Sequence, residues 1–300
     1  MKKKRSTILE RRNNRGYLYL LPWLIGFLVF QLYPIGMSLY YSFTDYSFGS
    51  NYSFVGLRNY IEIFTKDQEV VNSLKTTFKF VFMSVPMKLV SALVIAMLLN
   101  QKIKGIGVYR TVYYLPSILG GSVAIAILWR HLFALDGVVN VFINRLGIKS
   151  IGFLTDPKVA LTTISMLSVW QFGSSMLFFL AALKQVPQSL YEAAKIDGAG
   201  SVYSFIKITL PMISPMTLFN LIMQMINAFQ EYTAPAVITG GGPVKRTQVL
   251  AITLYQNAFS YRKMGYASSI SWIMFAIIIV FTIIIFSTSA KWTFYNDEEG

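Results

Sequence analysis

Long runs of apolar residues alternate with short polar stretches along this chain. A helix needs about 20 apolar residues to cross the hydrocarbon core of a bilayer. Runs of about that length lie at residues 17–43, 76–100, 108–131, 159–181, 208–230 and 265–289. The pattern therefore predicts an all-α integral membrane protein with about six transmembrane helices.

The first apolar run has features that the others lack. It contains Pro22 and Pro34, and a proline inside a helix removes a hydrogen bond and bends the axis. The run is longer than the apolar core of a secretory signal peptide, about 7 to 15 residues, and no small-residue cleavage site follows it. We therefore expect a bent membrane span rather than a leader.

Positive charge gathers ahead of the first span. The formal net charge of +14 would suggest a nucleic-acid partner if it were spread over a soluble surface. Segments next to the cytoplasmic ends of spans are rich in Lys and Arg, so we expect a cytoplasmic N-terminus, contact with membrane lipid and no nucleic acid. An even number of spans returns the C-terminus to the same side. The basic residues are Lys2, Lys3, Lys4, Arg5, Arg11, Arg12 and Arg15.

Composition favours a single membrane domain. Hydrophobic residues make up 54% of the chain and charged residues 13%, which is too apolar for a soluble protein of this size. We expect a basic cytoplasmic segment at 1–16, a transmembrane domain at 17–289 and a cytoplasmic tail at 290–300. With no cysteine and with His131 as the only histidine, no metal site is expected, and His131 is interpreted as an interface residue.

Two loops on the outer side carry recognisable patterns. Between residues 54 and 64, apolar residues recur at helical spacing, which predicts a short amphipathic helix at the membrane surface. They are Leu57, Tyr60, Ile61 and Phe64. The glycine-rich stretch 240–243 has no helical or strand pattern and is expected to be an exposed loop.

The loop at 186–211, cytoplasmic in this topology, has the features of a docking element. Ser189 and Glu192 have the spacing of a capping box at a helix start, and Gly198 and Gly200 provide a stop. Small residues let a partner approach the helix backbone closely, and acidic residues near both ends offer charged contacts. The candidate contact residues are Glu192, Ala193, Ala194, Asp197 and Gly198.

This loop resembles the signature of permease subunits in binding-protein-dependent ABC importers. The match consists of Glu192-Ala-Ala, three residues, Gly198, nine residues, Ile208, one residue and Leu210-Pro211. The sequence around this motif resembles that of the carbohydrate-uptake group, which contains relatives of the maltose and glycerol-3-phosphate permeases. Further stretches that resemble this group, in the same order, lie at residues 54–60, 109–117, 240–243 and 264–267.

The resemblance implies a type I ABC importer permease fold with a cytoplasmic coupling helix, in a bacterial cytoplasmic membrane. It implies that this chain forms half of the path of a sugar importer, with an oligosaccharide as the expected cargo. The implied partners are a second, non-identical permease, two ATPase subunits that bind ATP and Mg, and an extracytoplasmic sugar-binding protein. No phosphate-binding loop occurs in this sequence, so the chain is not expected to be an enzyme or to hold a cofactor.

Polar residues in the fifth predicted span suggest a substrate path. Asn220, Gln224, Asn227 and Glu231 fall on one stripe of a helix, and such groups avoid lipid. They would offer hydrogen bonds to sugar hydroxyls, while Trp170, Tyr113 and Tyr114 would offer rings for stacking. The alternative is that the amides hold neighbouring helices together.

Lys88 falls near the middle of the second predicted span, where an ammonium is unfavourable unless it is paired or reaches the interface. An acidic group on the substrate would pair with it. A partner carboxylate or an error in the span boundary explains it as well.

Other function classes receive less support from the sequence. An intramembrane enzyme would need catalytic motifs or paired acids that these spans lack. An ion-coupled secondary carrier or channel is compatible with six spans and remains the alternative, but a carrier would be expected to hold buried coupling acids, and only Glu231 approaches that description.

Overall fold

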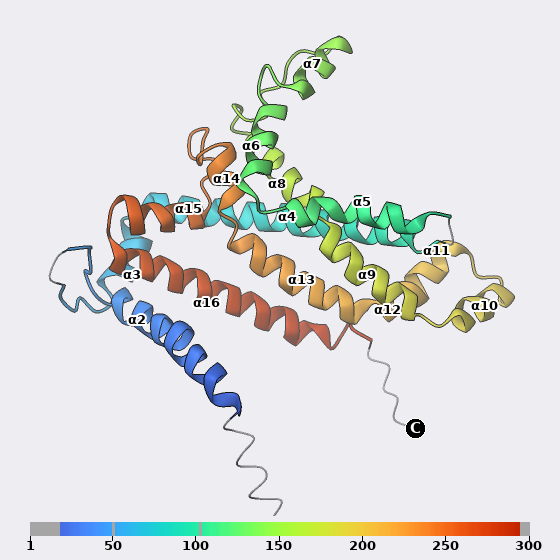
Figure 1. Cartoon of the computed structure of the whole chain (residues 1–300), viewed down its shortest axis with the longest axis horizontal. Coiled ribbons are helices and arrows are strands. Elements are labelled where there is room, and N and C mark those ends of the chain that lie inside the picture. Colours follow the sequence, from blue (N-terminus) through green and yellow to red (C-terminus); the bar gives the residue numbers. More distant parts are fainter. Residues whose placement is uncertain (1–18, 50–51, 102–103, 295–300) are drawn as a thin grey trace, which may run out of the picture. The chain divides into compact units, whose positions relative to one another are not determined.

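The computed structural model describes residues 19–49, 52–101 and 104–294 (Figure 1). The predicted basic segment at 1–16 and most of the predicted tail at 290–300 lie outside them. Among the described residues, regular structure is helical, with a single isolated bridge between Thr44 and Phe54. The prediction of an all-α protein is confirmed.

Three helices are long and apolar enough to cross a membrane unbroken. They are Tyr19–Ser42, α4 (Gln68–Leu99) and α16 (Met264–Ser289). The first contains a π-helical turn, η1 (Leu28–Leu32), which runs into α2 (Tyr33–Ser42) with Pro34 at its start. The predicted disturbance by proline therefore takes the form of a π turn, since Pro34 cannot donate a backbone hydrogen bond.

Three further spans are each made of helices joined at a sharp bend. Helices α5 (Ile106–Leu119) and α6 (Val123–Leu132) meet at 101°, and α8 (Ala160–Trp170) and α9 (Gly173–Gln185) meet at 47°. The segments Ser201–Met212 and Ser214–Ile238 meet at 67°. The described residues therefore supply up to six candidate spans when each bent pair counts as one, in agreement with the predicted number, although half of them are broken helices.

The chain divides into two compact units. Unit 1 comprises residues up to 66 together with 256–272, and unit 2 comprises 67–255 together with residues from 273 onward. Unit 1 holds the first span, α3 (Arg58–Thr65), η3 (Gln256–Ser260) and the start of α16. Unit 2 contains α4, all three bent spans and the remainder of α16.

In unit 1, hydrogen bonds fix α3 beside the end of the first span. The Asn59 side-chain amide donates to the carbonyl oxygens of Ser42 and Thr44, at 3.0 and 2.8 Å. The Ser269 hydroxyl, on α16, also donates to the Ser42 carbonyl, at 2.8 Å. Carbonyl groups that a helix end leaves without partners are thereby satisfied.

The predicted amphipathic helix at 54–64 is present as α3. Asn59 and Ile63 are buried within unit 1, whereas Leu57, Ile61 and Phe64 are exposed. The outward stripe is apolar, which is the arrangement of a helix that rests on a membrane surface.

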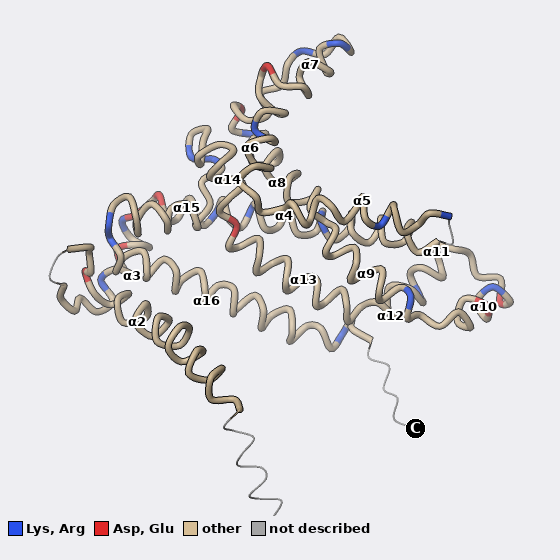
Figure 2. The backbone as a smooth tube through the Cα atoms, viewed as in Figure 1, with Lys and Arg blue, Asp and Glu red and all other residues tan. Residues whose placement is uncertain are grey.

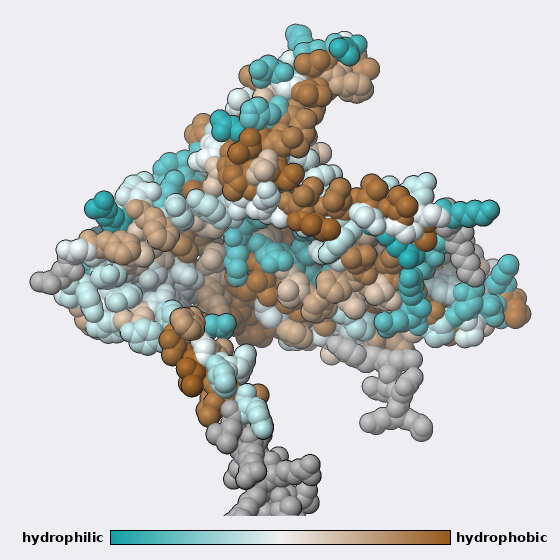
Figure 3. Space-filling model, viewed as in Figure 1, coloured by the Kyte–Doolittle hydropathy of each residue, from teal (hydrophilic) through white to brown (hydrophobic). Residues whose placement is uncertain are grey.

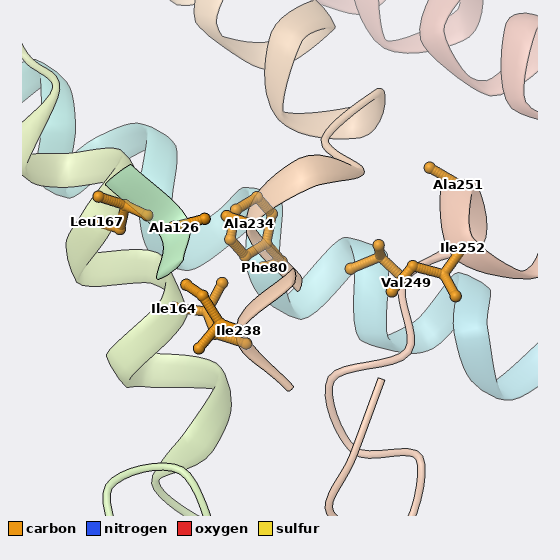
Figure 4. Packing of buried hydrophobic residues seen from close by; sticks show 9 residues of the cluster. All are labelled: Phe80, Ala126, Ile164, Leu167, Ala234, Ile238, Val249, Ala251 and Ile252. Atoms are coloured by element: carbon orange, nitrogen blue, oxygen red, sulfur yellow. The ribbon is translucent and has the colours of Figure 1, made fainter. Parts of the chain in front are cut away.

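Unit 2 is built around α4, which packs against α8, α9, α13 (Ser214–Phe229) and α15 (Leu250–Tyr255). Figure 4 shows one of its apolar clusters, which joins Phe80 of α4 to Leu167 of α8 and to Ile238 of α14 (Thr233–Ile238). A second cluster joins Ala92 and Ala96 of α4 to α9. Small residues on α4 bring α9 close to its backbone.

The remaining helices of unit 2 lie at its two ends. Helix α7 (Val138–Arg145) follows α6, and α10 (Gln188–Ile196), α11 (Ser201–Ser204), η2 (Phe205–Thr209) and α12 (Leu210–Met212) connect α9 to α13. Figure 1 shows α10 at the end of unit 2 where α4 stops and α5 begins, away from α6 and α14.

The glycine-rich stretch 240–243 is partly buried, so the expectation of an exposed loop is wrong. Gly241 is buried, and the Thr247 hydroxyl donates to the Gly242 carbonyl at 2.6 Å. Lys245 forms a salt bridge of 2.6 Å with Glu69 at the start of α4. The contact with Glu69, which is distant in the sequence, helps to fix the loop against the rest of unit 2. A local sequence pattern cannot predict such a contact.

Candidate substrate path and coupling helix

A polar cavity of about 470 Å³ lies within unit 2. Figure 3 shows hydrophilic residues gathered between the helices labelled α4 and α13 in Figure 1, inside a largely hydrophobic surface. The cavity is lined by Ser84, Val85, Lys88, Ser117, Gly120, Gly121, Ser168, Gln171, Ser174, Gln224, Asn227, Ala228, Gln230, Glu231, Tyr232 and Thr233. Polar side chains dominate this lining, in contrast to the apolar clusters on either side.

The cavity lies where helices are interrupted. Gly120 and Gly121 separate α5 from α6, Gln171 lies between α8 and α9, and residues 230–232 separate α13 from α14. A break frees backbone N–H and C=O groups, which inside a membrane are tolerated only in contact with protein or with a water-filled cavity. The breaks and the polar side chains thus meet at one polar site inside unit 2.

Ser117 of α5 ties the α5 span to the α8/α9 break. Its hydroxyl donates to the Gln171 carbonyl at 3.0 Å and accepts from the Ser174 N–H at 3.1 Å. A β-carbon on Gly173 would lie 2.7 Å from the Ser117 oxygen and 2.9 Å from the Tyr114 α-carbon. Glycine at position 173 is therefore needed for the close approach of α5 and α9.

The predicted polar stripe of α13 divides between the cavity and the protein interior. Gln224, Asn227 and Glu231 line the cavity, and Glu231 accepts a hydrogen bond of 2.9 Å from the Ala234 N–H. Asn220 is buried outside the lining, and its Nδ2 has no hydrogen-bond partner among the described residues.

Lys88 lies on the unbroken helix α4 and lines the cavity with Ser84 and Val85. Its side chain is half-buried. Within the described parts of the chain, its ammonium forms neither a salt bridge nor a hydrogen bond. Glu231 lines the same cavity without pairing with it.

The aromatic residues nominated from the sequence lie outside the lining. Trp170 packs against Trp129, with ring centroids 6.1 Å apart, and Tyr113 packs against Phe172 at 6.2 Å. Tyr114 joins the apolar cluster between α4 and α9.

The cavity has an aromatic residue that the sequence analysis missed. Tyr232 lines it from the break after α13 and packs against Tyr255, with ring centroids 5.0 Å apart. No periodic pattern marks it, because it lies outside the helical stripe.

The signature loop folds as α10 followed by a tight helix end. Ala199 N–H donates to the Ala194 carbonyl at 2.8 Å, and Gly198 N–H donates to the Lys195 carbonyl at 3.2 Å. Gly198 has φ +76°. This is a Schellman motif, which places glycine in the left-handed conformation just after the helix. The predicted stop at Gly198 is confirmed.

The predicted capping box is wrong. Helix α10 begins at Gln188, so Ser189 lies inside it, and the N-cap residue Pro187 makes no side-chain capping bond. The N-cap Pro187 is two residues ahead of Ser189, and its extended backbone, with φ −60° and ψ 130°, sets the start of the helix at Gln188.

Helix α10 presents its side chains to the outside of unit 2. Glu192, Ala193, Asp197 and Gly198 are exposed and Ala194 is half-buried. Figure 2 shows both signs of charge at α10, whereas α13 and α16 carry none.

Two exposed apolar residues that the sequence did not single out lie at the end of α10 and in α11. Ile196 is 86% exposed and Val202 72% exposed. The Tyr191 hydroxyl bonds to the Thr209 hydroxyl at 2.8 Å and so links α10 to η2. The loop therefore has a surface suited to a protein partner and a connection back to the path helices.

His131 is exposed on α6, and its Nδ1 lies 2.8 Å from the Ile127 carbonyl. Among the described residues, no group of three or more His, Cys, Asp or Glu side chains lies together.

Comparison with known proteins gives consistent matches. The family described as binding-protein-dependent transport system inner membrane component matches residues 68–292. The chain is 47% identical over 302 residues to the probable ABC transporter permease protein YesP of Bacillus subtilis (strain 168), covering 100% of this chain and 97% of that protein. It is 34% identical over 289 residues to the lactose transport system permease protein LacF of Rhizobium radiobacter, covering 94% and 96%.

A solved structure has the same fold. It belongs to a bacterial ABC transporter involved in the import of the acidic polysaccharide alginate, with a TM-score of 0.83 and 21% sequence identity, covering 97% of this chain and 100% of that chain. The predicted importer-permease fold is confirmed, and the matches give no support to an ion-coupled carrier or channel.

Proposed function

Since the chain belongs to the inner membrane components of binding-protein-dependent transport systems, we propose that it forms half of the path of an ATP-driven sugar importer, with an oligosaccharide as cargo. Two of the similar proteins carry lactose and alginate according to their names. The observation that carries the proposal is the polar cavity at the helix breaks, which has the hydrogen-bonding groups that sugar hydroxyls require.

Within the cavity, amide side chains would bind the sugar. Gln171, in the break between α8 and α9, and Gln224 and Asn227, on α13, offer both donors and acceptors. Tyr232 offers a ring face in place of Trp170, Tyr113 and Tyr114. Asn220 is buried and has an amide N–H without a partner, so its proposed role in the path is to become accessible when the helices move.

Energy for transport would enter at α10. Two ATPase subunits, which bind ATP and Mg and hydrolyse ATP, would bind the exposed residues Glu192, Ala193, Asp197 and Gly198 and the half-buried Ala194. The exposed side chain of Ile196 would lose its contact with water on docking and so add an apolar contact. The hydrogen bond between Tyr191 and Thr209 would pass the movement of α10 to η2 and α13.

The topology follows from the basic N-terminal segment. Residues 1–16, the loop 186–211 and the tail 290–300 are assigned to the cytoplasmic side, and the domain 17–289 to the membrane. A second, non-identical permease would complete the path, and an extracytoplasmic sugar-binding protein would deliver the cargo to the outer side.

The mechanism is alternating access. ATP binding closes the ATPase subunits, α10 moves with them, and the two permeases open outward to receive sugar from the binding protein. ATP hydrolysis returns the path to the inward-open state.

The test is reconstitution of this chain in lipid with its second permease, its ATPase and its binding protein. ATPase activity should rise when the binding protein carries one particular sugar, and sugar should accumulate in the vesicles only with ATP. Failure to form a complex with an ATPase, or uptake without ATP, would refute the proposal.

A matched pair of variants locates the coupling surface. Ile196→Ser should weaken stimulation of the ATPase, because it removes an apolar contact from α10. Val108→Ser changes a residue on α5 that is 69% exposed and lies outside the loop, so it should leave stimulation unchanged.

A further inference from the structure

We propose that the transported sugar carries a carboxylate, and that the ammonium of Lys88 recognises it inside the cavity. This inference rests on the proposed function and adds the chemical class of the substrate. The observation that carries it is that Lys88, on an unbroken helix and without a salt bridge, lines the same cavity as amide side chains of the broken spans.

Lys88 is too far from either end of α4 for its ammonium to reach a helix end. It is 11 residues from Leu99 and 20 from Gln68, and at a rise of about 1.5 Å per residue these separations are about 16 and 30 Å. A lysine side chain is shorter than either distance, so its charge stays at the depth of the cavity. An ionisable residue at such depth is retained where it meets a counter-ion or a water-filled path.

Lys88 forms no salt bridge among the described residues, although one carboxylate, that of Glu231, lines the same cavity. The salt bridge found in the described parts of the chain joins Lys245 to Glu69 at the start of α4. Glu231 is the acidic residue in the cavity lining, and its carboxylate accepts a hydrogen bond from the Ala234 N–H instead of contacting the ammonium. The Lys88 ammonium is thus available to a negatively charged group that enters the cavity.

The charge balance of the lining favours a carboxylate over a phosphate. Lys88 and Glu231 are the basic and the acidic residue of this lining, one of each sign. A bound carboxylate brings one negative charge, whereas a phosphate monoester brings between about 1.5 and 2. One ammonium beside a fixed carboxylate can balance the single charge of a bound carboxylate better than the larger charge of a phosphate. The lining also contains no arginine, whose rigid bidentate guanidinium favours phosphate.

The other lining groups suit the uncharged part of the same molecule. Gln171, Gln224 and Asn227 pair with hydroxyl groups. A uronic-acid sugar has both features, since one CH₂OH of the neutral sugar is replaced by a carboxylate.

The experiment uses the complete reconstituted complex and a panel of matched sugar pairs. Each pair consists of a neutral di- or trisaccharide and the same molecule with one CH₂OH oxidised to a carboxylate, and the 6-phosphate of each neutral sugar is a third member. The panel covers glucose, galactose and mannose backbones, and import is followed by mass spectrometry of the vesicle contents.

Import of a carboxylate member in preference to its neutral and phosphate counterparts is the expected result for the wild type. Lys88→Gln should lower the import of that carboxylate by about tenfold or more, the effect of losing a charge-assisted hydrogen bond, and should leave or raise import of the neutral counterpart. Lys88→Arg should retain most of the preference. Lys79→Gln, which removes an exposed charge from the same helix outside this cavity, should change nothing.

Two outcomes would overturn the inference while leaving the importer intact. One is preferential import of a neutral or phosphorylated member by the wild type. The other is an equal loss of every member in Lys88→Gln with the complex still assembled, which would show that Lys88 pairs with a carboxylate of the second permease. ATP-dependent import of no member at all would refute the proposed sugar importer itself, and this inference with it.

Discussion

Gly198 and Gly200 lie in the same exposed loop, yet only one of them requires glycine. Gly198 has φ +76°, and Gly200, the N-cap residue of α11, has φ −72°. At both positions an added β-carbon would meet nothing within 4 Å. The same substitution at the two sites therefore compares a left-handed with an ordinary backbone conformation, and packing inside this chain has little influence on the comparison.

We predict that Gly198→Ser uncouples the transporter and that Gly200→Ser does not. A left-handed residue other than glycine is destabilised by about 1–2 kcal/mol, which reduces the population of the closed helix end by a factor of about 5–30. Serine at position 200 is a favoured N-cap residue. Gly198→Asn should give an intermediate effect, because asparagine adopts the left-handed conformation more readily.

The effect is measured at the helix end and in the complex. Hydrogen exchange of the Ala199 amide, which donates to the Ala194 carbonyl at 2.8 Å, should accelerate in Gly198→Ser. Stimulation of ATPase activity by the loaded binding protein should fall in the same variant, while the ATPase subunits still co-purify with the permease.

The reasoning is refuted by either of two results. Equal effects of serine at the two positions would show that left-handed geometry is not what the loop needs. A larger loss of coupling in Gly198→Asn than in Gly198→Ser would show that side-chain size against the ATPase, and not conformation, decides the outcome.

Further predictions concern the path and unit 1. Gly173→Ala should lower the unfolding temperature and abolish import, since overpacking costs about 1–3 kcal/mol. Gly107→Ala, where an added β-carbon would meet nothing within 4 Å, should be neutral in both assays. Equal effects of the two substitutions would contradict the close approach of α5 and α9. The Ser53 backbone N–H, 2.6 Å from Asp45, holds the pKa of that carboxyl below its ordinary value. The contribution of Asp45 to stability is thus complete above the unfolded pKa of about 3.9 and is lost as the pH falls through the folded pKa. The difference in unfolding temperature between wild type and Asp45→Asn should shrink on acidification, and a constant difference would contradict this.

The spans were predictable from the sequence because hydrophobicity over about 20 residues is a local property. The helix breaks were not, because they depend on contacts between segments distant in the chain. The break at Gly120 depends on Gln171, whose side chain would lie 2.7 Å from a β-carbon at that position. The break between α8 and α9 is completed by Ser117, more than fifty residues earlier.

For the candidate site, side-chain chemistry was easier to predict than position. The spacing of Gln224, Asn227 and Glu231 follows from helical geometry, and these residues share the cavity. Tyr232 belongs to the irregular segment after α13, where no periodicity applies, so only the fold brings it to the lining.

The Ser117 hydroxyl has a mechanical consequence for the transport cycle. It accepts from one side of the α8/α9 break and donates to the other, and its neighbours Gly120 and Gly121 form the corner of α5 and α6. The hydroxyl thus links α5, one helical turn before that corner, to both sides of the α8/α9 break. While both bonds persist, α5 and the α8/α9 break are expected to move together, so a change in the bend of the α8/α9 span would be transmitted to the end of α5 beside the cavity.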